Sequence, residues 1–168
     1  DLNFAYQKAD FDAHKLAEAI KAAVPDKMRR EAITNWIEAD GNEELLRDRA
    51  EKSKGQRKRG YELALQLTDG ETLIARNINN THDALLAEAI KAGMLEHGVD
   101  LYMMHIWKRE NRLTKRIRAE VNASLLQPNP SFTKKRVWGT YFEGEQLGAV
   151  PVDKDAGFLV AARDSAFK

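Results

Sequence analysis

Apolar residues recur every three or four positions through most of this 168-residue sequence. The clearest run is Leu113, Ile117, Val121 and Leu125, which occupy successive four-residue steps. A period near 3.6 residues places such side chains on one face of an α-helix, and no stretch shows the strict alternation of a half-buried β-strand. The sequence therefore predicts a mainly α fold, an irregular multi-helix bundle of about six to eight helices with an extended C-terminal arm.

Prolines, glycines and capping residues set the expected ends of the helices. Thr68 and Glu71 have the spacing of a capping box, and Asn42 is a suitable N-cap. A break in the long helix is expected in the helix-poor stretch 77–81, and residues 52–59 are expected to form a basic hinge that contains Gly55. We expect helices at residues 4–23, 25–40, 42–50, 61–67, 68–93, 112–126 and 131–142, and a last one from about Asp153.

The helical stripes also give an expected core and an expected division of the chain. Residues 1–143 should form the bundle, and residues 144–168 should form the arm plus a C-terminal helix that looks truncated. The chain begins without Met and stops within a helical pattern, which suggests a piece of a larger polypeptide. The residues expected to be mostly buried are Phe11, Leu16, Ile20, Ile33, Trp36, Ile37, Leu85, Leu86, Ile90, Leu113, Ile117, Val121 and Leu125.

Charge and cysteine content exclude several classes of site. The 27 Lys and Arg nearly cancel the 26 Asp and Glu, so bulk charge favours neither nucleic acid nor an anionic membrane. The chain has no Cys, which excludes disulfides, thiolate metal sites and a Cys nucleophile. No apolar run approaches the roughly 20 residues of a membrane span, and the N-terminus does not resemble a signal peptide.

Catalytic and metal-binding patterns are weak. No pair of the four His has the i, i+4 spacing of a zinc-hydrolase helix, and a structural or surface role is the better interpretation of each. The paired carboxylates, such as Glu143 with Glu145, lie in turn-rich or charged contexts where solvation is expected. We therefore predict no catalytic residue, no metal site and no cofactor. An enzyme would have to assemble its site from His97, His105, Glu143 and Glu145.

One cluster combines basic with aromatic residues, as surfaces that bind nucleic acid often do. The alternative is a solvated helix face that acidic segments or a partner neutralise, and the near-zero net charge favours this alternative. Trp36, Trp107 and Trp138 are most simply anchors of the core. The cluster, which is a possible contact surface for nucleic acid or a partner, comprises Lys108, Arg109, Arg112, Lys115, Arg116, Lys134, Lys135, Arg136 and Trp138.

About half of the chain resembles segments of very large phage- and prophage-encoded polypeptides, the polyvalent or internal virion proteins that are packaged with the genome and delivered into the host. The similar pieces are an Ala-Gly-aliphatic-Leu turn before His97-Gly98-Val99, the stretch His105-Ile106-Trp107, Asn129-Pro130-Ser131-Phe132 leading to Lys134-Lys135-Arg136, and Phe142-Glu143-Gly144-Glu145. These motifs carry no defined catalytic role, so the resemblance implies a non-catalytic structural or interaction module.

The resemblance also sets expectations for partners and location. The partners would be other segments or subunits of the same large protein, with nucleic acid as the alternative. The location would be the virion and then the host interior, and without the resemblance the sequence indicates only a soluble domain. The oligomeric state stays open.

Overall fold

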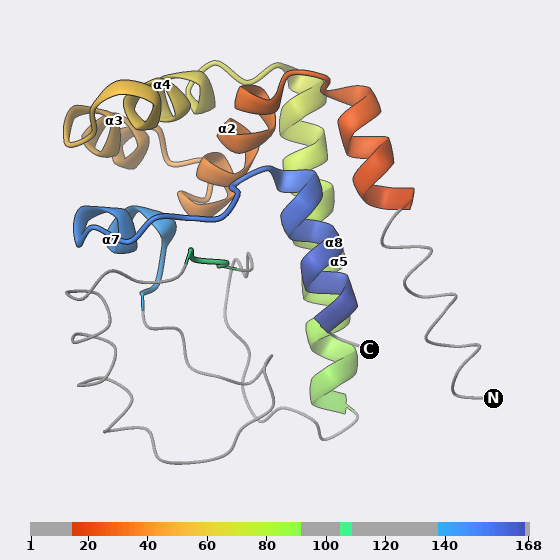
Figure 1. The fold of residues 1–168 in the computed structure, drawn as a ribbon. Coiled ribbons are helices and arrows are strands. Elements are labelled where there is room, and N and C mark those ends of the chain that lie inside the picture. The colour runs from red at the N-terminus through yellow and green to blue at the C-terminus, as the bar shows by residue number, and fades with distance from the viewer. Residues whose placement is uncertain (1–14, 92–104, 109–137, 167–168) are drawn as a thin grey trace, which may run out of the picture. The chain divides into compact units, whose positions relative to one another are not determined.

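The computed structural model describes residues 15–91, 105–108 and 138–166, except for the side chains of residues 85, 86, 89 and 163–166 (Figure 1). Within these residues the fold is mainly α, as predicted, and the only β pairing is an isolated bridge between Trp107 and Pro151. The helices are residues 15–23, α2 (Lys27–Glu38), α3 (Glu43–Glu51), α4 (Gly55–Ala64), α5 (Asp69–Lys91), α7 (Tyr141–Gln146) and α8 (Ala156–Ala166).

The chain divides into two compact units. The first combines Asp1–Met104 with Lys154–Lys168, and the second is His105–Asp153. This grouping differs from the predicted boundary at residue 144, because α8 packs against α2 and so belongs with the first unit. The second unit is therefore an insertion between two segments of the first.

Helix α2 organises the first unit. It packs against α4, α5 and α8, and α3 packs against α4 (Figure 1). Ala32, Ile33 and Ile37 of α2 are completely buried, as are Tyr61 of α4 and Leu159 of α8. These contacts remove both large and small apolar side chains from water, which is the main favourable term in folding.

The helix starts follow the capping signals in the sequence. Asn42 Oδ1 accepts a hydrogen bond from Leu45 N at 3.1 Å, which confirms it as the N-cap of α3. The capping box is also confirmed, since Thr68 N donates to Glu71 Oε2 at 2.8 Å and Glu71 N donates to Thr68 Oγ1 at 3.3 Å. Asp26 is the N-cap of α2. Pro25 therefore precedes the cap, and the prediction of a helix that begins at residue 25 is wrong by two residues.

Two expectations along the first unit are wrong. The basic stretch 52–59 is not a hinge throughout, because α4 begins at Gly55 and ends at Ala64, short of the expected 61–67 helix. The break expected in 77–81 does not occur, and α5 runs unbroken from Asp69 to Lys91. Ala75 and Ile78 are buried on the inner face of α5, so tertiary packing overrides the low helix propensity of the neighbouring Asn residues.

The expected core is partly confirmed. Ile20, Ile33 and Ile37 are buried, and Leu16 and Trp36 are half-buried. The prediction that Ile90 is buried is wrong, because 42% of this residue is exposed. The other residues of that prediction lie outside the described side chains: Phe11, Leu85, Leu86, Leu113, Ile117, Val121 and Leu125. The helix expected at 112–126 also lies outside the described residues.

The C-terminal part differs from prediction at its helix ends. Residues 138–140 are not helical, and Thr140 Oγ1 accepts from Glu143 N at 3.3 Å to cap α7, so the helix expected at 131–142 does not continue through them. Because α7 extends to Gln146, the non-helical arm covers only residues 147–155. Helix α8 begins at Ala156, later than the expected Asp153, because Asp155 Oδ1 accepts from Gly157 N at 2.9 Å at its start.

Candidate functional site

The predicted basic and aromatic cluster is described at only two of its nine positions. Lys108 is exposed, whereas Trp138 is only 9% exposed and its ring packs against Trp107. Because most of the Trp138 side chain is covered, its ring is better suited to packing within the protein than to stacking on a nucleic-acid base. The remaining members lie outside the described residues: Arg109, Arg112, Lys115, Arg116, Lys134, Lys135 and Arg136.

Aromatic rings pack together in the described part of the second unit. Trp107 lies 5.0 Å from both Trp138 and Tyr141, measured between ring centroids, and His105 lies 4.4 Å from Tyr141. The Tyr141 hydroxyl accepts from Ile106 N at 3.1 Å and donates to the Asp153 carbonyl at 3.4 Å. The hydroxyl thus joins Ile106, near the beginning of the unit, to Asp153 at its end, which is a structural role.

The two ends of the second unit also pair through their backbones. Lys108 N donates to the Val150 carbonyl and Val152 N donates to the Ile106 carbonyl, both at 2.8 Å. This short antiparallel pairing brings the entry and exit of the insertion side by side. Lys108 is therefore held on an ordered backbone, which its local sequence did not indicate.

Four residues are the candidates for an enzyme site, and the described ones make contacts that stabilise the fold. Glu143 accepts from Gly139 N at 2.7 Å next to the start of α7, and His105 packs on Tyr141. Glu145 is only 5% exposed, and His97 lies outside the described residues. Among the described residues, no group of three or more His, Asp and Glu side chains is placed to hold a metal ion.

The first unit contains a concave site, a groove lined wholly by described residues. It lies between the helix 15–23 and α5 and has a volume of about 260 Å³. Each helix contributes four side chains at spacing i, i+3, i+4 and i+7, which is one helical face over two turns. The lining residues are Leu16, Ala19, Ile20, Ala23, Ile74, Asn77, Ile78 and Thr81.

The groove has an apolar floor and a partly open rim. Ile20 and Ile78 are 4% and 3% exposed, whereas Ala19 and Ala23 are exposed. The polar lining groups are Asn77 and Thr81, and Thr81 Oγ1 donates to the Asn77 carbonyl at 2.8 Å. Because this hydroxyl is already bonded within α5, the site offers apolar surface with few unsatisfied polar groups.

Polar contacts fix the residues that directly follow the helix 15–23, which forms one wall of the groove. Arg30 Nη1 donates to the carbonyls of Val24 and Pro25, both at 2.7 Å, and its Nε donates to Asp155 Oδ2. Gly157 of α8 also lies against this wall, since a Cβ there would be 3.2 Å from the Ala17 carbonyl oxygen. The end of the first helix is thus tied to α2 and α8. The sequence predicted the apolar stripes of residues 15–23 and of α5, but it did not predict that these two helical faces lie against each other.

Comparisons of this chain with protein-family models, with curated proteins and with solved structures found no match. Among the described residues, no helix combines the length and apolar character that crossing a membrane requires.

Proposed function

We propose that this chain is a non-catalytic helical interaction module, and that the groove between residues 15–23 and α5 is its docking site. The observation that supports the proposal most directly is the lining: six of its eight side chains are apolar, and they come from two helical faces of matching spacing. In helix-in-groove recognition, an amphipathic helix lays an apolar face into a hydrophobic groove of this kind.

The size of the groove favours a helix over a small molecule. At about 260 Å³ it is below the roughly 300–1,000 Å³ of most ligand pockets. The exposed Ala19 and Ala23 would also let a partner helix approach closely, since the distance between packed helices depends on the side chains at their contact.

The occupant that we propose is a second copy of the chain. The lining of the groove is itself a pair of amphipathic helical faces, so two copies can dock face to face and bring four helices together around one apolar seam. Such a contact is self-complementary, as in the twofold dimers that dominate soluble oligomers.

The resemblance to phage-encoded polypeptides supports an extension of this proposal. The module would join copies of a large virion or ejected protein, and its location would be the virion and then the host interior. The predicted nucleic-acid role of the cluster at 108–118 and 134–138 stays a prediction, because most of its residues lie outside the described part of the chain.

Sedimentation velocity on the chain and two variants tests the docking site. Ala19→Glu places a charge in the groove, whereas Ala22→Glu places the same charge on an exposed position of the same helix outside it. We expect the average mass of the chain and of Ala22→Glu to rise to about midway between monomer and dimer as concentration reaches about 1 mM, where an association of about −4 kcal/mol is half-populated. Ala19→Glu should stay monomeric with unchanged helical circular dichroism.

Two results would overturn the proposal. One is a chain that stays monomeric over the whole concentration range. The other is a dimer that Ala19→Glu and Ala22→Glu weaken equally, which would place the contact elsewhere.

A further inference from the structure

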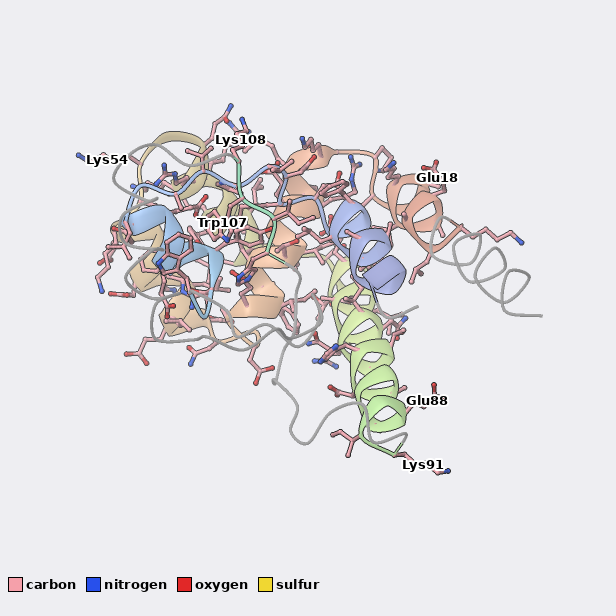
Figure 2. All side chains as sticks on the ribbon, turned by 60° about the horizontal axis from the view of Figure 1, so that its bottom comes forward. Glu18, Lys54, Glu88, Lys91, Trp107 and Lys108 are labelled. Atoms are coloured by element: carbon pink, nitrogen blue, oxygen red, sulfur yellow. The ribbon has the colours of Figure 1, made fainter. Side chains whose placement is uncertain are left out.

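A second surface of the first unit carries a concentration of positive charge. Five of the eight residues from 52 to 59 are basic, no acid occurs between 52 and 61, and Figure 2 shows the labelled Lys54 side chain extending away from the ribbon. All five side chains are exposed: Lys52, Lys54, Arg57, Lys58 and Arg59. We call these five residues the α4 basic surface.

The sequence around these cations holds fewer acids than cations. Lys52 pairs with Asp48 at 2.7 Å and Lys58 with Glu62 at 3.8 Å, and Glu51 is the other acid between positions 48 and 62. From position 48 to position 62, three acids thus stand against these five cations. Exposed pairs of this i, i+4 kind contribute roughly 0.3–0.5 kcal/mol, so each lysine is able to exchange its carboxylate for another anion.

The backbone beneath the cations adds to the positive field. Helix α4 begins with Lys54 as N-cap, has no side-chain hydrogen bond at the cap and has no acid in its first turn, whereas α3 begins with Asn42, Glu43 and Glu44. The positive end of the α4 dipole thus coincides with cations. At Gly55 a Cβ would meet nothing within 4 Å, so the approach to this end is open.

The surface lacks the features of a membrane anchor or a base-stacking platform. The apolar face of α4, with Tyr61 and Ala64, is buried, and the exposed large apolar side chains of the described residues lie outside α3 and α4. Interfacial helices need an exposed apolar face, and single-strand binding surfaces use exposed aromatic rings. Phosphate contact without stacking is what a duplex backbone offers.

We propose that the α4 basic surface binds the phosphate backbone of duplex nucleic acid without sequence preference. This surface is separate from the docking groove, so either proposal stands if the other fails. Binding should be weak and sensitive to salt, because it rests on counterion release. With about three phosphate contacts, affinity should fall roughly 40-fold between about 50 and 200 mM salt.

Fluorescence anisotropy with a labelled duplex of about 20 base pairs and mixed sequence tests the inference. The variant combines Lys54→Gln, Arg57→Gln and Arg59→Gln. The control combines Lys21→Gln, Arg47→Gln and Arg76→Gln, which removes the same residue types from exposed positions elsewhere on the first unit. At about 50 mM salt we expect the α4 variant to lose at least about tenfold in affinity and the control to lose less than about twofold.

Each other outcome overturns the proposal. Absence of duplex binding by the unaltered chain at about 50 mM salt excludes it. Equal losses in the two triple variants assign the binding to net charge alone. Binding that survives the α4 substitutions moves it to another surface, such as the cluster that includes Lys108. Preferential binding to phosphatidylserine vesicles, or to a polyglutamate peptide used as competitor, replaces nucleic acid with that partner.

Discussion

Asp155 Oδ2 accepts a hydrogen bond from Arg30 Nε at 2.7 Å, although the two residues are 125 positions apart in the sequence. Both side chains are buried, with the residues 4% and 8% exposed. The other oxygen of the same carboxylate accepts from Gly157 N at 2.9 Å. One carboxylate therefore joins α2 to the start of α8, and Arg30 extends the link to the end of the helix 15–23.

Asp155→Ala should destabilise the first unit by about 3–5 kcal/mol, because it leaves the buried Arg30 guanidinium without its carboxylate. Urea unfolding followed by circular dichroism measures the change. Glu43→Ala breaks the exposed pair of Glu43 with Arg47 and serves as the control, with an expected cost below about 1 kcal/mol. Equal losses of unfolding free energy in the two variants would show that the buried pair stabilises the fold no more than the exposed pair does.

Stability should decrease in acid because of Glu71. Its hydrogen bonds from Arg29, assisted by those from Thr68, lower its pKa from 4.5 to about 2 against the opposing effect of burial. A carboxylate whose folded pKa is depressed contributes stability above its unfolded pKa and loses it as pH falls. About 3 kcal/mol should therefore disappear between pH 4.5 and pH 2.

Unfolding free energies measured across this range test the assignment to Glu71. Glu71→Gln should be less stable than the unaltered chain at neutral pH and should lose less stability below pH 4.5. If the two proteins show parallel pH profiles, another group causes the acid dependence.

Alanine substitutions at Gly41 and Gly55 distinguish the cost of backbone strain from the cost of overpacking. Both have positive φ, 67° and 58°, but a Cβ on Gly41 would lie 2.6 Å from Trp36 Cζ2 whereas one on Gly55 would meet nothing within 4 Å. Gly55→Ala should cost about 1 kcal/mol from the left-handed backbone alone. Gly41→Ala should cost at least about 2 kcal/mol, because overpacking adds to the strain. Thermal unfolding of the two variants should show this order, and the reverse order would refute the contact.

The packing of Trp107 on α7 predicts the effect of changes at Gly144. A Cβ at this position would lie 2.6 Å from Trp107 Cζ2 and 3.0 Å from Trp138 Cε3. Gly144→Ala should destabilise the second unit by about 1–3 kcal/mol and change the near-ultraviolet circular dichroism of its tryptophans. Gly139→Ala meets only the flexible carboxylate end of Glu143 and should cost less. Equal effects would contradict the ring contact.

The sequence predicted the features that depend on neighbouring residues. Asn42 and the pair Thr68 and Glu71 begin helices because a side chain within three positions satisfies free N–H groups, and this requirement is local. Apolar spacing likewise identified Ile33 and Ile37 as core residues. Local capping and spacing are readable because a helix bonds each residue to one four positions away.

Where local preference and packing disagreed, the sequence was misleading. The Asn-rich stretch of α5 stays helical because Ile78 is buried. The apolar stripe of α5 predicted a buried Ile90, but this residue is exposed although it continues the stripe. Propensity differs by less than about 1 kcal/mol per residue, which burial of one aliphatic side chain exceeds.

The sequence by itself determined a mainly helical chain, several of its helix starts and the amphipathic faces of residues 15–23 and α5. Only the tertiary structure decided that these two faces meet in a groove, that Asp155 closes on Arg30, and that residues 105–153 form an inserted unit. Such pairings join segments that are far apart in the chain, and their free energy comes from burial and charge contacts that exist only after the segments have packed together.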